Sequence, residues 1–204
     1  MLMRQPALVC LDMEGVLTPE IWVTVAAKTG IEALRRTTRD EPDYDKLMRN
    51  RLAILKEHGL RLSDIQAVIA TLDPLEGSVE FLTTLRAKVP VIVLSDTFYP
   101  FAGPLMEKLG FPVLFCNTLE VSAQGIIQSY HLRLADQKRA SVIALKQLGF
   151  RILAAGDSYN DTTMLKEADI GILFRPPQTV AKAFPQFPVT TTYAELAQQL
   201  ARHL

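Results

Sequence analysis

The sequence lacks several features that would point to large classes of protein. It has 22 Lys and Arg residues against 22 Asp and Glu residues, so it carries no basic excess for binding nucleic acid or an anionic membrane. No apolar stretch approaches the ~20 residues that a membrane-spanning helix needs. The first apolar run is interrupted by Asp12 and Glu14 before it reaches the length of a signal-peptide core. We therefore expect a cytoplasmic protein with a small-molecule partner, and neither nucleic acid nor a membrane among its partners.

Cysteine and histidine are also scarce. The two cysteines, Cys10 and Cys116, each lie in an apolar run without the spacing of metal ligands, which predicts buried thiols in a reducing compartment. The three histidines do not cluster in the sequence. A histidine-based metal site or catalytic triad is therefore not predicted.

What the sequence does contain is a series of short apolar runs that alternate with segments of helical periodicity. Continuous runs of four or five apolar residues are typical of strands buried on both faces of a parallel sheet. The expected strands cover residues 7–11, 91–94, 113–115, 152–155, 170–173 and 189–191. The expected helices cover residues 77–88, 101–109, 138–148 and 162–168. This alternation predicts an α/β fold with a doubly wound, mainly parallel sheet.

Two regions depart from this alternation. Residues 20–71 have helical patterns and no strand-like run, and residues 117–132 around Gly125 resemble a β-hairpin. A helical block inserted after the first strand would lie above the carboxyl ends of the sheet, where open α/β folds bind ligands. We therefore expect a core domain of residues 1–15 and 74–204 and a small helical cap domain of residues 16–73, which would exclude water and select the substrate. The apolar residues of the cap suit either the core of a lid or a homodimer interface, and the sequence leaves both open.

Polar residues gather at the ends of the predicted strands. They are Asp12 and Glu14 after the first strand, Ser95, Asp96 and Thr97 at the end of the second, Asp157, Asn160 and Asp161 after the fourth, and Lys138 at the start of the helix before the fourth. Taken singly, such residues are ordinary helix caps, turns or solvated helix starts. Parallel strands, however, place their carboxyl ends on one edge of the sheet, so we expect these side chains to converge.

Their chemistry suits phosphoryl transfer, which needs an in-line nucleophile, a divalent cation and donors around the transferred group. Asp12 is the candidate nucleophile, which would form an acyl phosphate. Glu14 is the candidate acid that protonates the departing alkoxide and later accepts a proton from water. Asp12 and Asp157 are the expected carboxylate ligands of Mg²⁺, with the backbone carbonyl of Glu14 as a third protein ligand. Ser95 and Lys138 are expected to hydrogen-bond the phosphoryl group.

The remaining polar residues have supporting roles in this interpretation. Asp96, Thr97 and Asn160 are candidates for contact with the substrate. Asp161 is expected to orient Lys138 or the waters of the metal.

These motifs resemble those of a known family. The stretch from Asp12 to Thr18, then Ser95, then Lys138, then the stretch from Gly156 to Asp161 match in order the four motifs of haloacid-dehalogenase-type phosphatases. The resemblance covers essentially the whole chain and implies a Rossmann-like core, a Mg²⁺ cofactor and phosphomonoester hydrolysis.

The insert resembles that of the phosphoserine phosphatase branch of this superfamily. Glu20 and Arg51 lie where that branch holds the amino group and the carboxylate of its substrate, which implies that phosphoserine is the substrate. A carboxylate at a helix start is also stabilised by the helix dipole, and an arginine in a charged region is often a surface group. These structural interpretations of Glu20 and Arg51 stay open from the sequence.

The first motif departs from the usual Asp-x-Asp of the family, because it reads Asp12-Met13-Glu14. The stretch from Asp12 to Trp22 is similar to that of the bifunctional phosphoserine phosphatase/homoserine phosphotransferases, which implies transfer of the phosphoryl group to homoserine as well as to water. The reference pKa values of Asp and Glu differ by only ~0.4, so the position of the longer side chain matters more than its acidity. Our hypothesis is that the displaced carboxyl of Glu14 makes room for an alcohol acceptor.

Two alternatives remain at this stage. The same core site would serve a phosphatase of another small phosphomonoester, because the cap alone sets that choice. A phospho-accepting signalling module also uses a strand-end Asp, a Ser or Thr and a Lys. Such receiver modules, however, place the Lys after a later strand and lack both a lid-sized insert and a Gly-Asp-x-x-x-Asp loop.

Overall fold

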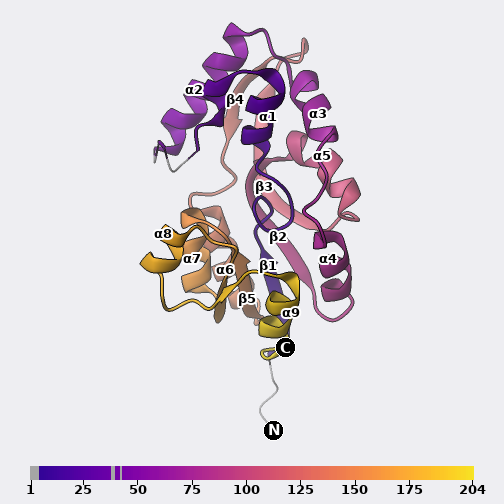
Figure 1. Ribbon diagram of the computed structural model, residues 1–204, viewed down its shortest axis with the longest axis vertical. Helices are drawn as coiled ribbons and strands as arrows, with labels where there is room; N and C mark the ends of the chain where they lie inside the picture. Colours follow the sequence, from indigo (N-terminus) through magenta and orange to yellow (C-terminus); the bar gives the residue numbers. More distant parts are fainter. Residues whose placement is uncertain (1–4, 38–39, 42) are drawn as a thin grey trace.

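The computed structural model describes residues 5–37, 40–41 and 43–204 of the chain. Residues 1–4, 38–39 and 42 belong to the predicted domains but lie outside the described residues. The long axis of the molecule runs from the sheet and its helices at one end to the inserted helices at the other (Figure 1).

A seven-stranded sheet forms the centre of the fold, in the order β4-β3-β2-β1-β5-β6-β7. Its strands are β1 (Ala7–Leu11), β2 (Val91–Phe98), β3 (Val113–Val121), β4 (Ile127–His131), β5 (Arg151–Gly156), β6 (Ile170–Phe174) and β7 (Val189–Thr190). All neighbouring pairs are parallel except β3 and β4, which form the predicted hairpin. The predicted α/β class with a mainly parallel sheet is therefore confirmed.

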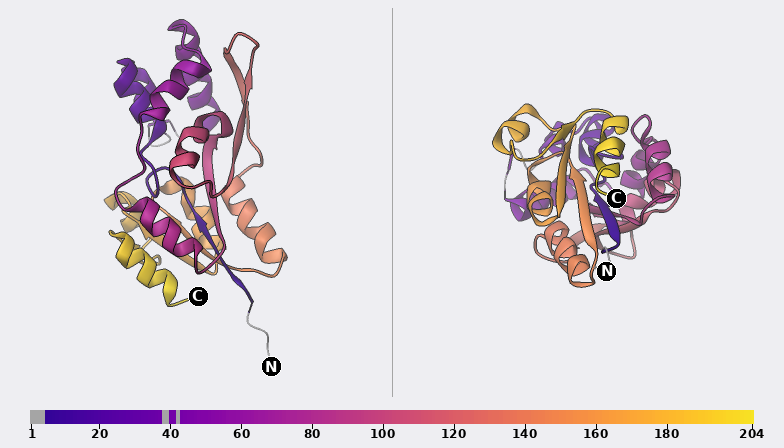
Figure 2. Two further views of the ribbon diagram at one scale, coloured as in Figure 1. Left: turned by 90° about the vertical axis from the view of Figure 1, so that its right-hand side faces the viewer. Right: turned by 90° about the horizontal axis from the view of Figure 1, so that it is seen from below.

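Helices cover both faces of this sheet (Figure 2). One face carries α4 (Ser78–Arg86), α5 (Tyr99–Lys108) and α9 (Tyr193–Ala201), and the other carries α6 (Gln137–Gln147), α7 (Thr162–Glu167) and α8 (Gln178–Ala183), with the short helix η2 (Tyr159–Asp161) preceding α7. The alternation of side chains along β1 explains this arrangement. Val9 and Leu11 pack into the core on the α4 side, whereas Leu8 and Cys10 pack into the core on the α6 side.

The inserted segment forms a group of helices above the carboxyl ends of the strands. It consists of α1 (Ile21–Thr29), η1 (Glu32–Arg35), α2 (Tyr44–Glu57) and α3 (Leu62–Ala70). The β3–β4 hairpin rises beside these helices (Figures 1 and 2). Gln66 on α3 donates a hydrogen bond of 2.8 Å to the carbonyl of Pro100 on α5, so the insert also contacts the core helices directly.

The strand β2 extends well beyond the apolar run that predicted it. β2 continues through Ser95, Asp96 and Thr97 to Phe98, where its pairing with β3 resumes at Asn117 after an irregularity. The sequence did not predict this extension because polar side chains, which line the cavity at the end of the strand, replace the apolar pattern there.

Within the described residues, no helix is long and apolar enough to cross a membrane.

Candidate active site

Asp12 lies directly after β1, the central strand of the seven-stranded sheet. Its backbone N–H donates to the carbonyl of Ala155 at 2.9 Å, which continues the pairing with β5 by one residue. Its carboxylate Oδ1 accepts hydrogen bonds of 2.7 Å from the N–H of Met13 and from Lys138 Nζ, and Oδ2 takes part in neither. The residue is 4% exposed. The sheet and these two donors therefore fix the direction of the carboxylate.

Lys138, at the start of α6, joins the ends of two strands. Its ammonium donates to Asp12 Oδ1 and to Asp161 Oδ1, each at 2.7 Å, and lies 3.8 Å from Asp96 Oδ2. Burial disfavours the charged amine, but the carboxylates of Asp12, Asp161 and Asp96 outweigh burial and raise the pKa of Lys138 well above its ordinary value. Lys138 is thus held as a cation beneath the site.

Asp161 is fully buried and uses both of its carboxylate oxygens within the protein. Oδ1 accepts from Lys138, and Oδ2 accepts from the backbone N–H groups of Asp157 and Ser158 at 2.9 and 3.1 Å. A Cβ atom at Gly156 would collide with Asp161, so the chain needs glycine at this bend. This arrangement sets the direction of Lys138 and the position of Asp157 together.

The carboxylates at this edge of the sheet fit a divalent cation. Asp12, Asp157 and Asp161 each place an oxygen within 4.8 Å of the others. Burial and the neighbouring Asp161 raise the pKa of Asp157 to about 7, and the same two causes raise the pKa of Asp12 well above its ordinary value although Lys138 opposes them. Three buried carboxylates thus face one ammonium, and hard oxygen donors with excess negative charge are what Mg²⁺ binds. Because Asp161 is occupied by its own partners, Asp12 and Asp157 are the carboxylates that suit the ion.

The end of β2 forms the adjoining wall. Ser95 and Thr97 are both buried, and the Ser95 hydroxyl accepts a hydrogen bond of 3.2 Å from the N–H of Thr97. Gln137 donates to the carbonyl of Ser95 at 2.5 Å, which fixes this strand end to α6.

Asp96 connects four separate parts of the chain. Its carboxylate accepts from Asn160 Nδ2 at 2.8 Å and from Gln137 Nε2 at 3.4 Å. Its backbone carbonyl accepts from Asn117 Nδ2 at 3.1 Å and from the Tyr44 hydroxyl, on α2 of the insert, at 3.3 Å. Asp96 therefore links the inserted helices to the core at the edge of the site.

These residues open into a cavity of about 870 Å³ between the core and the inserted helices. Of the predicted site residues, the cavity is lined by Asp12, Glu14, Glu20, Arg51, Ser95, Asp96, Thr97, Lys138 and Asn160. The remaining two, Asp157 and Asp161, adjoin Asp12 in the carboxylate cluster beneath it. The structure thus brings every predicted site residue to one place.

Glu14 lies on the turn between β1 and the insert. Its Oε2 accepts a hydrogen bond of 2.9 Å from the N–H of Ile21, the first residue of α1. Burial, and next the nearby carboxylate of Glu20, raise the pKa of Glu14 to about 8. A carboxyl with a raised pKa is suited to holding a proton that it can give and take back.

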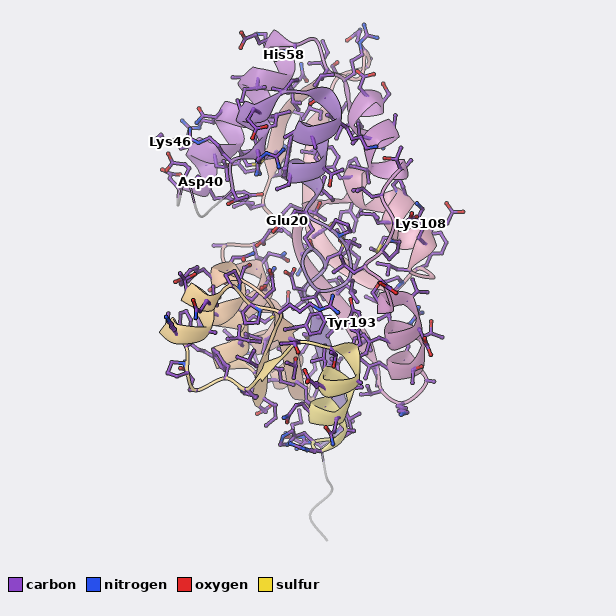
Figure 3. All side chains as sticks on the ribbon, in the orientation of Figure 1. Glu20, Asp40, Lys46, His58, Lys108 and Tyr193 are labelled. Carbon is purple, nitrogen blue, oxygen red and sulfur yellow. The ribbon has the colours of Figure 1, made fainter. Side chains whose placement is uncertain are left out.

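Arg51, on α2, contributes a buried cation from the inserted side. Its guanidinium lies 4.6 Å from the ring centroid of Trp22, and its Nη2 donates to the carbonyl of Arg36 at 2.7 Å. Burial lowers the pKa of Arg51 to about 10, against the influence of Tyr44, Glu14 and Glu20. Its Nε is buried without a hydrogen-bond partner among the described residues. The cavity is therefore lined by the Arg51 guanidinium and the Glu20 carboxyl, and Figure 3 shows Glu20 where the insert meets the core.

Comparison with known proteins assigns this arrangement to a family. The sequence model of the haloacid dehalogenase-like hydrolases matches residues 6–169. The chain belongs to this family. It is 59% identical over 193 residues to the phosphoserine phosphatase ThrH of Pseudomonas aeruginosa, which covers 95% of this chain and 94% of that protein. It is 60% identical over 193 residues to a phosphoserine phosphatase of Pseudomonas syringae pv. tomato, which covers 95% of this chain and 81% of that protein.

Solved structures give the same fold. A phospho-aspartyl intermediate analogue of phosphoserine phosphatase superposes with a TM-score of 0.79 at 20% identity, over 96% of this chain and 99% of that one. A substrate-bound phosphoserine phosphatase complex superposes with a TM-score of 0.78 at 20% identity, over 97% and 99% of the two chains. The predicted family and the prediction that this haloacid dehalogenase-like protein is an enzyme, a phosphomonoester hydrolase, are confirmed.

Sequence reasoning missed several residues of the site. Tyr44 and Gln137 both bond to the end of β2, and the Trp22 ring packs against the Arg51 guanidinium. Gln137 directly precedes the predicted site residue Lys138, and this position in the sequence was the signal that could have identified it. Tyr44 had none, because its contact with Asp96 joins segments 52 residues apart.

Proposed function

We propose that this hydrolase is a Mg²⁺-dependent phosphoserine phosphatase that acts through an aspartyl phosphate on Asp12 and also transfers the phosphoryl group to homoserine. The observation that carries the proposal is the position of Asp12 at the bottom of a cavity whose inserted side carries Glu20 and Arg51. The names of the two Pseudomonas relatives support the choice of phosphoserine.

In the first step, a carboxylate oxygen of Asp12 attacks phosphorus and the bond from phosphorus to the serine oxygen breaks. Oδ2 suits this attack because Oδ1 is engaged by Lys138 and by the N–H of Met13. Glu14 gives its proton to the departing serine alkoxide. Ser95 and Lys138 donate hydrogen bonds to the phosphoryl oxygens and offset their charge.

In the second step, water gives a proton to Glu14 and attacks phosphorus, and the bond to Asp12 breaks to release phosphate. An alcohol such as homoserine reacts in the same way, and its hydroxyl proton goes to Glu14. The products are then phosphohomoserine and free Asp12. Glu14 ends each cycle in the protonation state in which it began.

Mg²⁺ belongs to this proposal because of the charge of the carboxylate cluster. The carboxylates of Asp12 and Asp157 and the backbone carbonyl of Glu14 would hold the ion. Bound there, Mg²⁺ supplies positive charge for the phosphoryl oxygens.

The charges of the insert explain the choice of an amino acid. A Glu20 carboxylate suits the ammonium of phosphoserine, and the Arg51 guanidinium suits its carboxylate. Thr97, Asp96 and Asn160 complete the wall beside them. As part of this proposal, residues 16–73 act as the cap domain of the core, and the enzyme works in the cytoplasm. Sedimentation analysis distinguishes a homodimer from a monomer whose apolar cap residues form only the core of the lid.

The proposal is tested by incubating the protein with phosphoserine and Mg²⁺ while free phosphate is measured, and then adding homoserine and measuring phosphohomoserine. EDTA should stop both reactions, and excess Mg²⁺ should restore them. Phosphate without phosphohomoserine would leave a phosphatase that uses water alone. Hydrolysis of other phosphomonoesters but not of phosphoserine would refute the substrate, and a long-lived aspartyl phosphate with slow turnover would favour a signalling module.

A further inference from the structure

Tyr193, the first residue of α9, contacts the turn that carries Glu14 although it does not line the cavity. Its hydroxyl donates a hydrogen bond of 2.7 Å to the backbone carbonyl of Val16. Figure 3 shows Tyr193 at the end of α9 that faces the insert, below Glu20. The family sequence model ends at residue 169, so Tyr193 lies in the part of the chain beyond this match.

Aromatic packing fixes the Tyr193 ring in place. The ring stacks on Phe81 and on Phe174, with centroid distances of 5.0 and 4.9 Å, and the Arg175 guanidinium lies 5.0 Å from its centroid. A Cβ atom built on Gly77 would lie 3.3 Å from the ring, so glycine at this position gives the ring its space. The hydroxyl is therefore presented to Val16 by a side chain with little freedom to turn away.

The turn that receives this bond is tightly closed. The carbonyl of Met13 accepts from the N–H groups of Leu17 and Thr18 at 2.7 and 2.9 Å, and the N–H of Gly15 donates to the carbonyl of Thr18 at 2.8 Å. Since these bonds lie within the turn, they shape it but do not attach it to the core. The bond from Tyr193 to Val16 is one that does.

A second attachment joins the turn to the chain that returns from the insert. The N–H of Leu75 donates to the carbonyl of Leu17 at 2.9 Å. Leu75 itself lies in a connecting segment, whereas Tyr193 belongs to a helix that packs on the sheet. The Tyr193 hydroxyl thus provides a hydrogen-bonded link from the turn, whose Val16 and Leu17 side chains are buried in the core, to a helix that packs on the sheet.

We infer that Tyr193 is a positioning residue, which holds the turn of residues 13–18 and thereby aims the Glu14 carboxyl at the reacting oxygen. The catalytic part of this inference rests on the proposed role of Glu14. Tyr193 acts only through Val16, so its loss should affect proton transfer more than substrate binding by Glu20 and Arg51. The attachment of the turn itself is independent of the identity of the substrate.

The test is Tyr193→Phe, which removes the hydroxyl and keeps the stacked ring. The matched control is Tyr99→Phe, because the Tyr99 hydroxyl also donates to a backbone carbonyl, that of Leu114 at 3.0 Å, away from the turn. Hydrogen exchange of the peptide covering residues 13–20 is measured by mass spectrometry in both variants. We expect exchange of the Leu17 and Thr18 amides to rise about five- to tenfold in Tyr193→Phe, as a lost hydrogen bond of ordinary strength predicts. Exchange in Tyr99→Phe should match the unmodified protein.

Kinetics provide the second readout, with phosphoserine and with p-nitrophenyl phosphate as substrates. We expect kcat of Tyr193→Phe to fall roughly tenfold on each substrate that the unmodified enzyme hydrolyses, with KM within about twofold. Unchanged exchange in residues 13–20 would overturn the inference whatever the substrate is. Faster exchange with unchanged kcat would also overturn it. If the unmodified enzyme hydrolyses p-nitrophenyl phosphate but not phosphoserine, the proposed substrate fails while the Tyr193 inference is still decided by the other ester.

Discussion

The two sides of the cavity are built in different ways. The floor, which we define as Asp12, Lys138, Asp157 and Asp161, comes from the core, and all four of its side chains are buried. Two of its three carboxylates are paired, since Lys138 bonds to Asp12 and Asp161 at 2.7 Å. The floor is therefore organised before a substrate arrives, apart from an excess of negative charge that suits a cation.

The roof, which we define as Glu20, Trp22, Tyr44 and Arg51, comes from the inserted helices. Arg51 rests on Trp22 and bonds to a backbone carbonyl. Among the described residues, its guanidinium forms no ion pair with a carboxylate. Tyr44 reaches the core through one hydrogen bond of 3.3 Å. Unlike the floor, the roof leaves its charges available. Under the proposed function, the floor performs the chemistry and the roof selects the molecule on which it is performed.

The largest expected effect comes from removing the nucleophile from the floor. Asp12→Asn keeps the shape of the side chain, and we expect kcat to fall by roughly 10⁴-fold or more on every phosphomonoester. The fold should persist, because the asparagine oxygen can still accept from Lys138 and Lys138 keeps the Asp161 carboxylate as its ion-pair partner. Steady-state assays and thermal melting check both statements. Substantial remaining activity would show that Asp12 is not the nucleophile.

The next prediction separates the charge balance of the floor from its catalytic role. Lys138→Met leaves three buried carboxylates without their ammonium, and breaking such a buried pair costs about 3–5 kcal/mol of stability. Adding Asp161→Asn to this variant removes one of the unpaired charges, so the double variant should recover part of the loss. Urea unfolding of both variants and of Asp161→Asn alone measures the coupling. A Lys138→Met variant as stable as the unmodified protein would contradict an ionised floor.

The contrast between floor and roof also explains how far the sequence could predict the structure. Asp12 and Asp157 follow apolar strands, and Lys138 lies at the start of the helix that leads into the second of these strands. Parallel strands leave little choice about where their ends meet, so these three residues were predictable as neighbours. The contact of Tyr44 with Asp96 was not, and the bond of Tyr193 to Val16 joins residues 177 positions apart. Such bonds depend on how helices settle on the sheet, for which periodicity carries no information. The apolar first half of β2 was predictable from its continuous hydrophobic run, whereas its polar second half, from Ser95, interrupts that run and was not.

The roof should respond to substitution in a substrate-dependent way. Arg51→Met keeps much of the side-chain length but removes the cation, and we expect KM for phosphoserine to rise roughly 10- to 100-fold, as the loss of a charge-assisted contact predicts. KM and kcat for p-nitrophenyl phosphate, which has no carboxylate, should change by about twofold or less. Arg49→Met is the control, because Arg49 lies on the same helix, is exposed and pairs with Asp45. An equal loss on both substrates would assign Arg51 a structural role.

The smallest expected effect concerns Glu14, which lies on the turn between floor and roof. Its carboxyl bonds to the N–H of Ile21 at the start of α1, and an aspartate, one methylene shorter, would not reach this N–H from the same backbone position. Released from the N–H of Ile21, the shorter carboxyl of Glu14→Asp would no longer be held aside toward α1, so the room for an alcohol would be lost and water would compete better. We expect the ratio of phosphohomoserine to phosphate to fall by about threefold or more, with total turnover changed less, since the pKa values of the two acids are similar. The ratio is measured at several homoserine concentrations, with Arg49→Met as a variant that should leave it unchanged. An unaltered ratio in Glu14→Asp would refute the hypothesis that the longer side chain makes room for the alcohol acceptor, and the choice of acceptor would then belong to the roof alone.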